Sequence, residues 1–582
     1  IGTAGALYNK LLPLSYYSTP SYWGEYVCDE LGNDCRVTDV FNSDDYTLSP
    51  SKSSPGRELQ YERINVNNGT DIYDASTWQI ALALAAREGL SSSRKMESLL
   101  DLIENQNLLL LFGHDGNYRS DDLPYGINRA TTKDDGTFTY NGLEISQPEN
   151  AFYFRMVARQ WLSTDPFMGT EYERNISVEN LPKDNPEYKK GKVSWADWKP
   201  ITGENAWAFL IGPLQGDYIK NVEIEEKNYV PFESISMQNA LSVLYAFQGL
   251  QSPLGGIYYA ATGSLGNVGD ESVNPFEISV ENNASALAGL WIFQDLLKLS
   301  VEHETELSYV QKKSIRNAIE DIDSMLYGGP TPNDYDTDGL LSFFKNYAWD
   351  KEQGTFLQGG FANNPNADSE WIPTYSPKAV DVQTWTITVL GQRVIDEWNG
   401  FGASYRAWET TKQWGGFYGP DGEFWGVGYS EKDGNGQDAD YTTGILSAEW
   451  TAGAINLVRA LIVEYRTVLD DPSASGSNKN SAEQYIQKLK DDERSMVRHL
   501  TSLRTDQYSG TVAFEQNRPT NYDTLVAMST DKLAFLYSSK RYFIPFGWYA
   551  NPIPSTCSTS WALMLHYNYN PFQLGGGYRS RS

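Results

Sequence analysis

One pattern recurs along this chain and constrains its fold more than any other feature. One or two polar residues are followed by small or aromatic residues and then by an apolar stretch with helical spacing, which predicts a buried helix. The pattern opens at Ser76-Thr77-Trp78, Glu149-Asn150-Ala151-Phe152, Glu204-Asn205-Ala206-Trp207, Ser236-Met237-Gln238-Asn239, Glu281-Asn282-Asn283, Asp381-Val382-Gln383-Thr384-Trp385, Ser447-Ala448-Glu449-Trp450 and Ser558-Thr559-Ser560-Trp561.

More polar, amphipathic segments lie between several of these starts, for example at 92–105, 309–326 and 481–503. Such segments predict helices that show one face to water. Buried helices alternating with amphipathic ones are what a ring of helical hairpins requires. We therefore expect a mainly α fold with long loops and a few short β-hairpins. Since no long linker divides the chain, residues 74–582 are predicted to form one large domain, with residues 1–73 as an N-terminal extension packed on it.

The charge balance excludes several classes of partner. The 582 residues include 46 Lys and Arg against 75 Asp and Glu, a net charge of −29, which repels nucleic acid and anionic membrane surfaces. A neutral glycan fits this charge better. The longest apolar runs, such as 107–112, are far shorter than the ~20 residues that cross a bilayer, so no membrane span is expected. The start at Ile1, with few cysteines and many Tyr and Trp, favours a processed, secreted, extracellular protein.

The residues available for catalysis are mainly carboxylates. The four histidines show no metal-binding spacing, and no phosphate-binding glycine motif occurs, so metal and nucleotide chemistry are not expected and no cofactor is required. Cleavage of a glycosidic bond needs two carboxyl groups, one protonated and one ionised. The 17 Trp and 38 Tyr supply rings that stack on sugars, and amide side chains bind hydroxyl groups.

Three carboxylates are candidates for catalysis: Glu281, Asp381 and Asp440. Polar and aromatic neighbours of the helix starts are candidates for substrate binding, namely Glu204, Asn205, Trp207, Asn282, Gln383, Trp385, Trp425, Tyr429, Glu449 and Trp450. Two structural alternatives stay open. The polar residues are equally consistent with helix N-caps, and the aromatic region 414–450 is equally consistent with a packed β-hairpin.

Smaller signals concern metal, disulfide and glycan sites. Asp334, Asp336 and Asp338 form the D-x-D-x-D-G opening of a calcium loop, but Lys345 replaces the glutamate at its twelfth position, so an acidic turn is an equal alternative to a structural Ca²⁺ site. Cys28 and Cys35 could close a small disulfide. Three sequons begin at Asn68, Asn175 and Asn283, each a candidate for N-glycosylation.

From Asp74 to Tyr567 the arrangement resembles the (α/α)6-toroid glycoside hydrolases, at the level of architecture. In those enzymes the starts of the inner helices line one open face that bears two acidic residues and several Trp. The resemblance implies that Glu281 is similar in placement to a general acid, and Asp381 or Asp440 to the base. It does not identify the sugar, because the sequence contains no motif that defines one family.

The leading hypothesis is therefore a secreted glycoside hydrolase that cleaves a neutral polysaccharide or oligosaccharide. Trp207, Trp385, Trp425 and Trp450 would be its sugar platforms. The alternative is a non-catalytic extracellular protein that binds glycan or assembles as a structural surface glycoprotein. A polysaccharide lyase is less favoured, because it needs a Tyr or His base and a cationic partner for the uronate. The sequence leaves the oligomeric state open.

Overall fold

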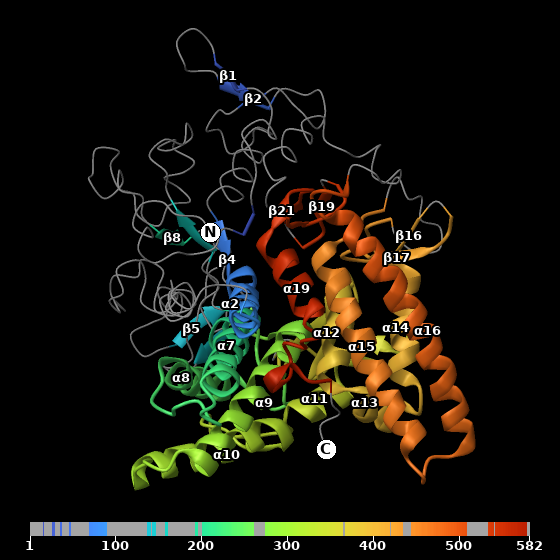
Figure 1. Ribbon diagram of the computed structural model, residues 1–582. Helices are drawn as coiled ribbons and strands as arrows, with labels where there is room; N and C mark the ends of the chain where they lie inside the picture. Colours follow the sequence, from blue (N-terminus) through green and yellow to red (C-terminus); the bar gives the residue numbers. More distant parts are fainter. Residues whose placement is uncertain are drawn as a thin grey trace.

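The computed structural model shows a mainly helical protein (Figure 1). The residues that it describes are 15–16, 26–28, 35–37, 46–47, 69–89, 137–140, 143–146, 157–160, 193–195, 201–260, 274–364, 367–419, 421–434, 444–508, 533–540, 542–546 and 548–578. The α class predicted from the sequence is confirmed.

Six helical segments are buried on most of their sides, and we call them the inner helices. Most of their side chains lie in the hydrophobic core. They are α2 (Ile72–Arg87), the continuous run α6 (Thr202–Ala206), η3 (Trp207–Ile211), α7 (Gly212–Tyr218) and η4 (Ile219–Ile224), then α9 (Val280–His303), α12 (Val380–Leu390), α15 (Ala448–Asp470) and α19 (Thr556–His566).

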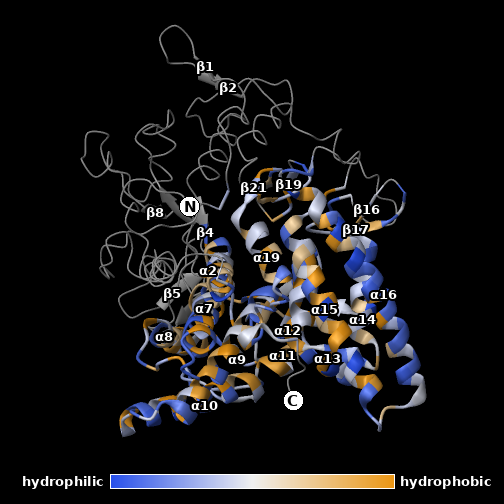
Figure 2. Ribbon diagram, in the orientation of Figure 1, coloured by the Kyte–Doolittle hydropathy of each residue, from blue (hydrophilic) through white to orange (hydrophobic). Residues whose placement is uncertain are grey.

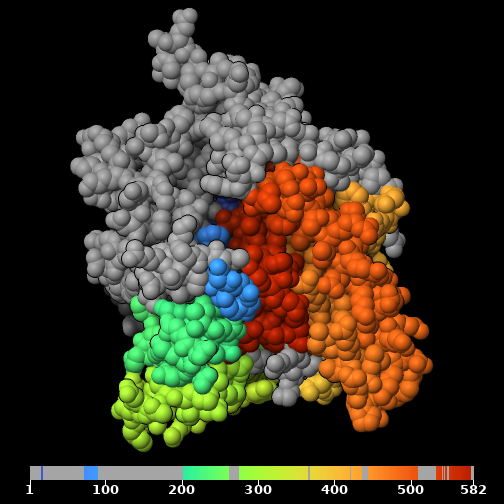
Figure 3. All heavy atoms as spheres, in the orientation of Figure 1, coloured from blue at the N-terminus to red at the C-terminus, as the bar shows by residue number. Residues whose placement is uncertain are grey.

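The contacts between inner helices follow chain order and then return to the beginning. Helix α2 packs against α7, α6 against α9, α9 against α12, α12 against α15 and α15 against α19. The last inner helix, α19, packs against the first, α2. Figure 3 shows α19 in red, seated between the blue α2 and the orange C-terminal helices. The contacts therefore form a closed cycle, and each inner helix is covered on two sides by other inner helices.

Other helices lie outside this cycle and keep a polar face (Figure 2). Helix α10 packs on α8 and α9, α14 on α12, and α16 on α15. These helices are α8 (Ile235–Leu250), α10 (Tyr309–Tyr327), α11 (Leu340–Asn346), α13 (Gln392–Asn399), α14 (Ala403–Gly415) and α16 (Gly476–Leu500). The predicted amphipathic segments 309–326 and 481–503 are thus confirmed as α10 and α16. Two predicted buried helices differ. Helix α8 exposes Ile235 and Tyr245, and the stretch after the predicted start at 149–152 contains strand β7 (Val157–Gln160).

Strands are short and antiparallel. Two three-stranded sheets precede inner helices: β4 (Gly69–Asp71) with β7 (Val157–Gln160) and β8 (Val193–Trp195), and β9 (Glu277–Ser279) with β14 (Gly359–Ala362) and β15 (Trp371–Thr374). The others are β1 (Tyr26–Cys28), β2 (Cys35–Val37), β3 (Tyr46–Thr47), β5 (Thr137–Tyr140), β6 (Leu143–Ser146), β10 (Gly329–Pro330), β11 (Asp336–Thr337), β12 (Trp349–Asp350), β13 (Thr355–Phe356), β16 (Gly416–Tyr418), β17 (Phe424–Val427), β18 (Phe535–Leu536), β19 (Tyr542–Ile544), β20 (Trp548–Ala550) and β21 (Pro554–Ser555).

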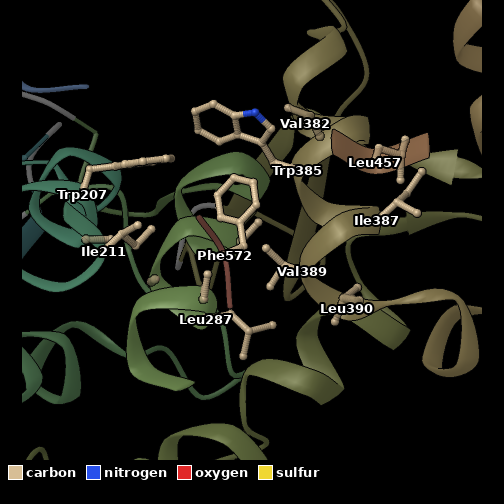
Figure 4. Close-up of a cluster of buried hydrophobic side chains, with 14 of the residues drawn as sticks. Trp207, Ile211, Leu287, Val382, Trp385, Ile387, Val389, Leu390, Leu457 and Phe572 are labelled. Carbon is tan, nitrogen blue, oxygen red and sulfur yellow. The ribbon is translucent and has the colours of Figure 1, made fainter. Parts of the chain in front are cut away.

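Aromatic rings fill the centre of the cycle. Trp207 and Trp385 lie 5.4 Å apart between ring centroids, and Trp561 lies 6.3 Å from Trp385. Phe572, from the C-terminal segment, is 5.7 Å from Trp207 and 5.6 Å from Trp385 (Figure 4). The C-terminal segment thus inserts an aromatic side chain among the inner helices and closes their core.

Gln215 of α7 anchors this C-terminal segment. Its amide nitrogen donates to the carbonyl oxygens of Pro571 (2.9 Å) and Gln573 (2.7 Å), and its amide oxygen accepts from the hydroxyl of Tyr569 (2.6 Å). Since all these groups are buried or partly buried, each bond replaces one that water would otherwise make.

By length and hydropathy, α9 is the one helix among the described residues that could cross a membrane, although 78% of its most apolar window is buried inside the fold. A buried core helix can be as long and as apolar as a membrane-spanning helix, so the length and hydropathy of α9 are weak evidence for a span.

Replacing Phe572 with Ala should lower the free energy of unfolding by about 3–5 kcal/mol, because it leaves a cavity among three tryptophans. Chemical denaturation would measure the loss. The matched change Tyr309→Ala, at a side chain that is 79% exposed, should alter stability by no more than about 0.5 kcal/mol. Equal effects of the two changes would contradict the closing role of the C-terminal segment.

Candidate functional site

The N-terminal ends of the inner helices bring several carboxyl groups within electrostatic reach of one another. Asp71 and Asp74 come from α2 and its cap, Glu281 from α9, Asp381 from α12 and Glu449 from α15. Glu449 interacts with Asp71, Asp74, Glu281 and Asp381. We call these five residues the carboxyl cluster.

Serine caps fix the starts of three inner helices, whereas α12 begins after Ala379 without a side-chain cap. Ser279, Ser447 and Ser555 cap α9, α15 and α19, each accepting from a backbone N–H three residues later at 3.2–3.3 Å. The cap fixes where each helix begins. The second residue of each helix then occupies an equivalent place.

That second position carries the chemistry of the site. It is occupied by Tyr73 in α2, Gly203 in α6, Glu281 in α9, Asp381 in α12, Glu449 in α15 and Cys557 in α19. In α2 and α6 an acid, Asp74 or Glu204, stands at the third position instead. Three consecutive inner helices therefore present a carboxylate at the same place.

Asp381 is partly exposed at the start of α12. Burial raises the pKa of its carboxyl to about 7, and the nearby Glu449 contributes. The backbone N–H of Val382 donates to Asp381 Oδ1 at 2.7 Å and opposes this rise. Asp381 is thus a carboxyl group that titrates near neutral pH and that water can reach.

Glu449 is also partly exposed, at the start of α15. Burial raises the pKa of its carboxyl to about 7, and Asp71 and Glu281 raise it further. The thiol of Cys557 donates to Glu449 and acts in the opposite direction. Thr77 Oγ1 lies 3.6 Å from the sulfur of Cys557 and donates to it. Glu449 and Asp381 therefore form a pair with matched acidity.

Asp74 lies deeper, with 4% of its surface exposed. Burial and then Asp71 raise the pKa of its carboxyl well above the usual value. Ser15 donates to it, and the Cys557 thiol lies close enough to donate its one proton either here or to Glu449. The phenol of Tyr16 also lies near Asp74: burial raises the pKa of the phenol, and the charge of Asp74 raises it further. Asp74 is therefore a largely inaccessible member of the carboxyl cluster.

Glu281 is held by two side chains of its own helix. Asn282 Nδ2 donates to Glu281 Oε2 at 2.6 Å, and Ser285 Oγ donates to Oε1 at 3.0 Å. Its exposed fraction is 8%, so it is less accessible than Asp381 or Glu449.

The aromatic candidates fall into three places. Trp207 and Trp385 lie in the central core, with 0% and 4% of their surface exposed. Trp450 packs edge to face on Tyr429 at 4.9 Å, next to Glu449. Trp425 of β17 stacks on His499 of the outer helix α16 at 4.2 Å. Tyr73 also packs on the two central tryptophans and is partly exposed. The centroid of its ring lies 5.9 Å from that of Trp207 and 6.0 Å from that of Trp385.

Three amide candidates hold the scaffold. Gln383 exchanges two hydrogen bonds, at 2.7 and 2.9 Å, with the backbone of Phe356. Asn205 Nδ2 donates to the carbonyl of Ile201 at 2.7 Å. Asn282 Oδ1 accepts from the N–H of Gly203 at 2.6 Å and so joins α9 to α6. Glu204, the remaining polar candidate, is buried in the first turn of α6.

Sequence reasoning missed Asp71, Asp74, Tyr16 and Cys557. It placed the first helix start at Ser76, whereas α2 begins at Ile72, and Ser76 lies inside the helix with its hydroxyl bonded to the carbonyl of Ile72 at 2.8 Å. The signal was Asp71, two residues before the N–H of Tyr73 that it caps at 3.0 Å. Cys557 was missed for the same reason, because α19 begins at Thr556 rather than at Ser558.

Several predicted positions lie outside the described residues: Asp440, Asn68 and Asn175. Asn283 is described and fully buried, and its amide nitrogen donates to the carbonyls of Ile257 (3.0 Å) and Ser279 (2.8 Å). The predicted glycan at Asn283 is therefore wrong for the folded chain, because the side chain has no access to solvent.

The proposed calcium loop is an exposed turn. Asp334, Asp336 and Asp338 are all exposed, and β11 pairs Asp336 with Pro330 of β10. Within the described ranges, no group of three or more His, Cys, Asp or Glu side chains could hold a metal ion. The calcium site remains a prediction without structural support in that part of the chain.

Comparison with the models of known protein families finds no match to this chain, and comparison with curated protein sequences finds no significant match.

The raised pKa values predict how stability depends on pH. Free Asp and Glu titrate near pH 4, whereas Asp381 and Glu449 keep their protons up to about pH 7 in the folded state. Their contribution to stability is therefore present below pH 4 and is lost as pH rises through 7. The double change Asp381→Asn with Glu449→Gln should stabilise the protein at pH 8, by roughly 2 kcal/mol after allowing for partial exposure.

Denaturation at pH 8 and at pH 5 would measure this difference, which should shrink at the lower pH. The control is Asp506→Asn, because Asp506 is exposed and paired with Arg504 at 2.6 Å. That change should give no gain at pH 8. If the double variant is no more stable than the wild type at pH 8, the pKa values of Asp381 and Glu449 are not raised in the folded protein.

Proposed function

We propose that this chain is a secreted glycoside hydrolase of the (α/α)6-toroid kind, acting on a neutral glycan, with Glu449 as general acid and Asp381 as base or nucleophile. The closed cycle of contacts among six inner helices supports the toroid. The observation that carries the function is the pair itself. Two partly exposed carboxyls at equivalent positions of neighbouring inner helices titrate near the same neutral pH.

The surroundings of the pair favour the proton on Glu449. Asp381 accepts a backbone N–H from Val382 at 2.7 Å, and a hydrogen bond to the charged form favours that form. Glu449 also accepts one hydrogen bond, from the Cys557 thiol, but it lies near two further carboxyl groups, Asp71 and Glu281, and like charges favour its neutral form. A single shared proton would therefore reside on Glu449 and leave Asp381 ionised. One protonated and one ionised carboxyl group are what glycosidic cleavage requires.

The reaction assigned to this pair is ordinary acid and base chemistry. Glu449 would donate its proton to the leaving glycosidic oxygen while the bond from that oxygen to the anomeric carbon breaks. Asp381 would take a proton from the attacking water, or attack the anomeric carbon itself and be released by water in a second step. Neither route calls for a metal or a redox cofactor.

Charge supports an uncharged substrate. Among the described residues, the charged groups acting most strongly on Asp381 and Glu449 are other carboxylates, and no lysine or arginine of that part of the chain is among them. A uronate or sulfated sugar would be repelled by such surroundings. This also disfavours a polysaccharide lyase, which needs a cationic partner for its uronate.

Tyr73 is the best-placed ring for a sugar. It occupies the second position of α2 and is partly exposed. Its ring contacts Trp207 and Trp385, which are both buried. Aromatic rings backed by other rings are rigid, so a sugar that stacks on Tyr73 loses little to side-chain ordering. We include Tyr73 in the proposed substrate site.

The register of β1 and β2 supports the extracellular part of the proposal. The antiparallel pairing sets Cys28 directly opposite Cys35, as a disulfide across a hairpin requires. The described residues contain no formed disulfide, and Cys557 is a free, buried thiol. We therefore keep the bond between Cys28 and Cys35 as a prediction that fits an oxidising compartment.

Replacing Glu449 with Gln, or Asp381 with Asn, should lower hydrolysis of a neutral glycan by about 10²–10⁴-fold, because each change removes one of the two proton-transfer groups. Release of reducing ends from a panel of neutral glucans, mannans, xylans and their oligosaccharides would measure it. Melting temperatures should be unchanged or higher, which separates lost chemistry from lost folding.

Glu464→Gln provides the matched control. Glu464 lies about 22 Å further along α15, at ~1.5 Å per residue, and burial likewise raises the pKa of its carboxyl to about 7. Its oxygens accept from the backbone N–H groups of Gln392 and Arg393 at the start of α13. It should retain activity. Equal activity of wild type and Glu449→Gln would refute the assignment, and binding without release of reducing ends would favour the non-catalytic glycan-binding alternative.

A further inference from the structure

A chain of hydrogen bonds runs from Trp207 through Ser285 to Glu281. Trp207 Nε1 lies 3.1 Å from Ser285 Oγ, and Ser285 Oγ lies 3.0 Å from Glu281 Oε1. An indole N–H can only donate, so the Ser285 oxygen accepts from Trp207. The Ser285 hydroxyl in turn donates to Glu281 Oε1.

A second chain fixes the orientation of the Asn282 amide. The backbone N–H of Gly203 donates to Asn282 Oδ1 at 2.6 Å. Because a backbone N–H is also a pure donor, the oxygen of the amide must face Gly203. The amide nitrogen therefore faces Glu281 Oε2, at 2.6 Å, with Ser279 Oγ as its other neighbour at 3.2 Å.

Both oxygens of Glu281 thus receive a donor, and the direction of the Asn282 donor is set by a group that cannot accept. A proton on Oε2 would compete with the Asn282 donor. Hydrogen bonds of this kind favour the ionised form of a carboxyl group. They also let it stay charged although only 8% of its surface is exposed.

We propose that Glu281 is a positioning residue, a carboxylate that keeps the neighbouring Glu449 in its acid form and does not itself donate the proton. The inference rests on the proposed function and assigns a role within the same site. It changes the role that the resemblance to toroid hydrolases implies for Glu281.

The electrostatics of Glu449 agree with this role. Glu281 is one of the charges that raise the pKa of Glu449. The other titratable groups that face Glu449 come from several packed elements: Asp71 and Asp74 of α2 and its cap, Asp381 of α12, Cys557 of α19, Tyr16 of the N-terminal segment and Tyr429 of the loop after β17. Of these, Cys557 donates to Glu449 and lowers its pKa, whereas burial, Asp71 and Glu281 raise it.

Infrared spectroscopy of the whole protein labelled with [¹³C]glutamate tests the proposal without relying on turnover. The protonated-carboxyl band that disappears in Glu449→Gln identifies Glu449, and its pH titration is then followed in other variants. In Glu281→Gln this titration should move to lower pH by about one unit, since one nearby charge is removed. In Ser285→Ala, which keeps the charge and removes one donor, it should move by less.

Kinetics add a second readout. The basic limb of the pH profile of kcat/KM should move to lower pH in Glu281→Gln, while kcat at the new optimum falls by less than about tenfold. A true proton donor would instead lose about 10²–10⁴-fold at every pH. Melting curves of both variants report folding. If Glu281→Gln folds poorly, Ser285→Ala still tests the proposal, because it should move the Glu449 titration in the same direction by a smaller amount and leave turnover in place.

Three results would overturn the inference: a Glu281 carboxyl that is protonated in the wild type near pH 5.5, an unmoved Glu449 titration in Glu281→Gln, or loss of turnover at every pH in that variant. If the wild type hydrolyses no glycan, the proposed function fails, but the infrared titration still decides whether Glu281 controls the proton on Glu449.

Discussion

The structure depends on placing several carboxyl groups of one sign at the starts of buried helices. Burial penalises each charge, and the carboxylates penalise one another. The N-terminal ends of helices act in the other direction, because unpaired N–H groups there favour negative charge. The pKa values of Asp381 and Glu449 are raised to about 7, and burial raises the pKa of the deeper Asp74 well above its usual value. The site therefore gathers carboxyl groups that are all weaker acids than free Asp and Glu.

The inner helices and their caps make this placement possible. Each helix is covered by two inner neighbours, and its start faces the shared region. A serine or aspartate cap sets which residue lies there in α2, α9, α15 and α19, whereas α6 and α12 begin without a side-chain cap. The aromatic core beneath, closed by Phe572 from the C-terminal segment, holds Trp207 in place. Trp207 in turn donates to Ser285, which donates to Glu281. Packing, capping and proton placement are thus parts of one connected set of contacts.

Much of this could be predicted from the sequence, and the exceptions have physical reasons. The apolar periodicity predicted the inner helices, and the starts at Glu281, Asp381 and Glu449 were located correctly. Their roles were not separable, because a pKa depends on neighbours that are distant in sequence. Asp71 and Cys557 were missed because a serine inside a helix looks like a cap in the sequence alone. Trp425 looked like a member of the site because it is near Glu449 in the sequence, but β17 carries it to His499 of α16.

The most direct test of the central claim is a crystal structure of the Glu449→Gln variant with a neutral oligosaccharide. The account predicts a sugar that spans the carboxyl cluster, with its glycosidic oxygen within hydrogen-bond distance of residue 449, its anomeric carbon facing Asp381 and a sugar face on Tyr73. An oligosaccharide bound away from the starts of α12 and α15, or no oligosaccharide bound at saturating concentration, would contradict it.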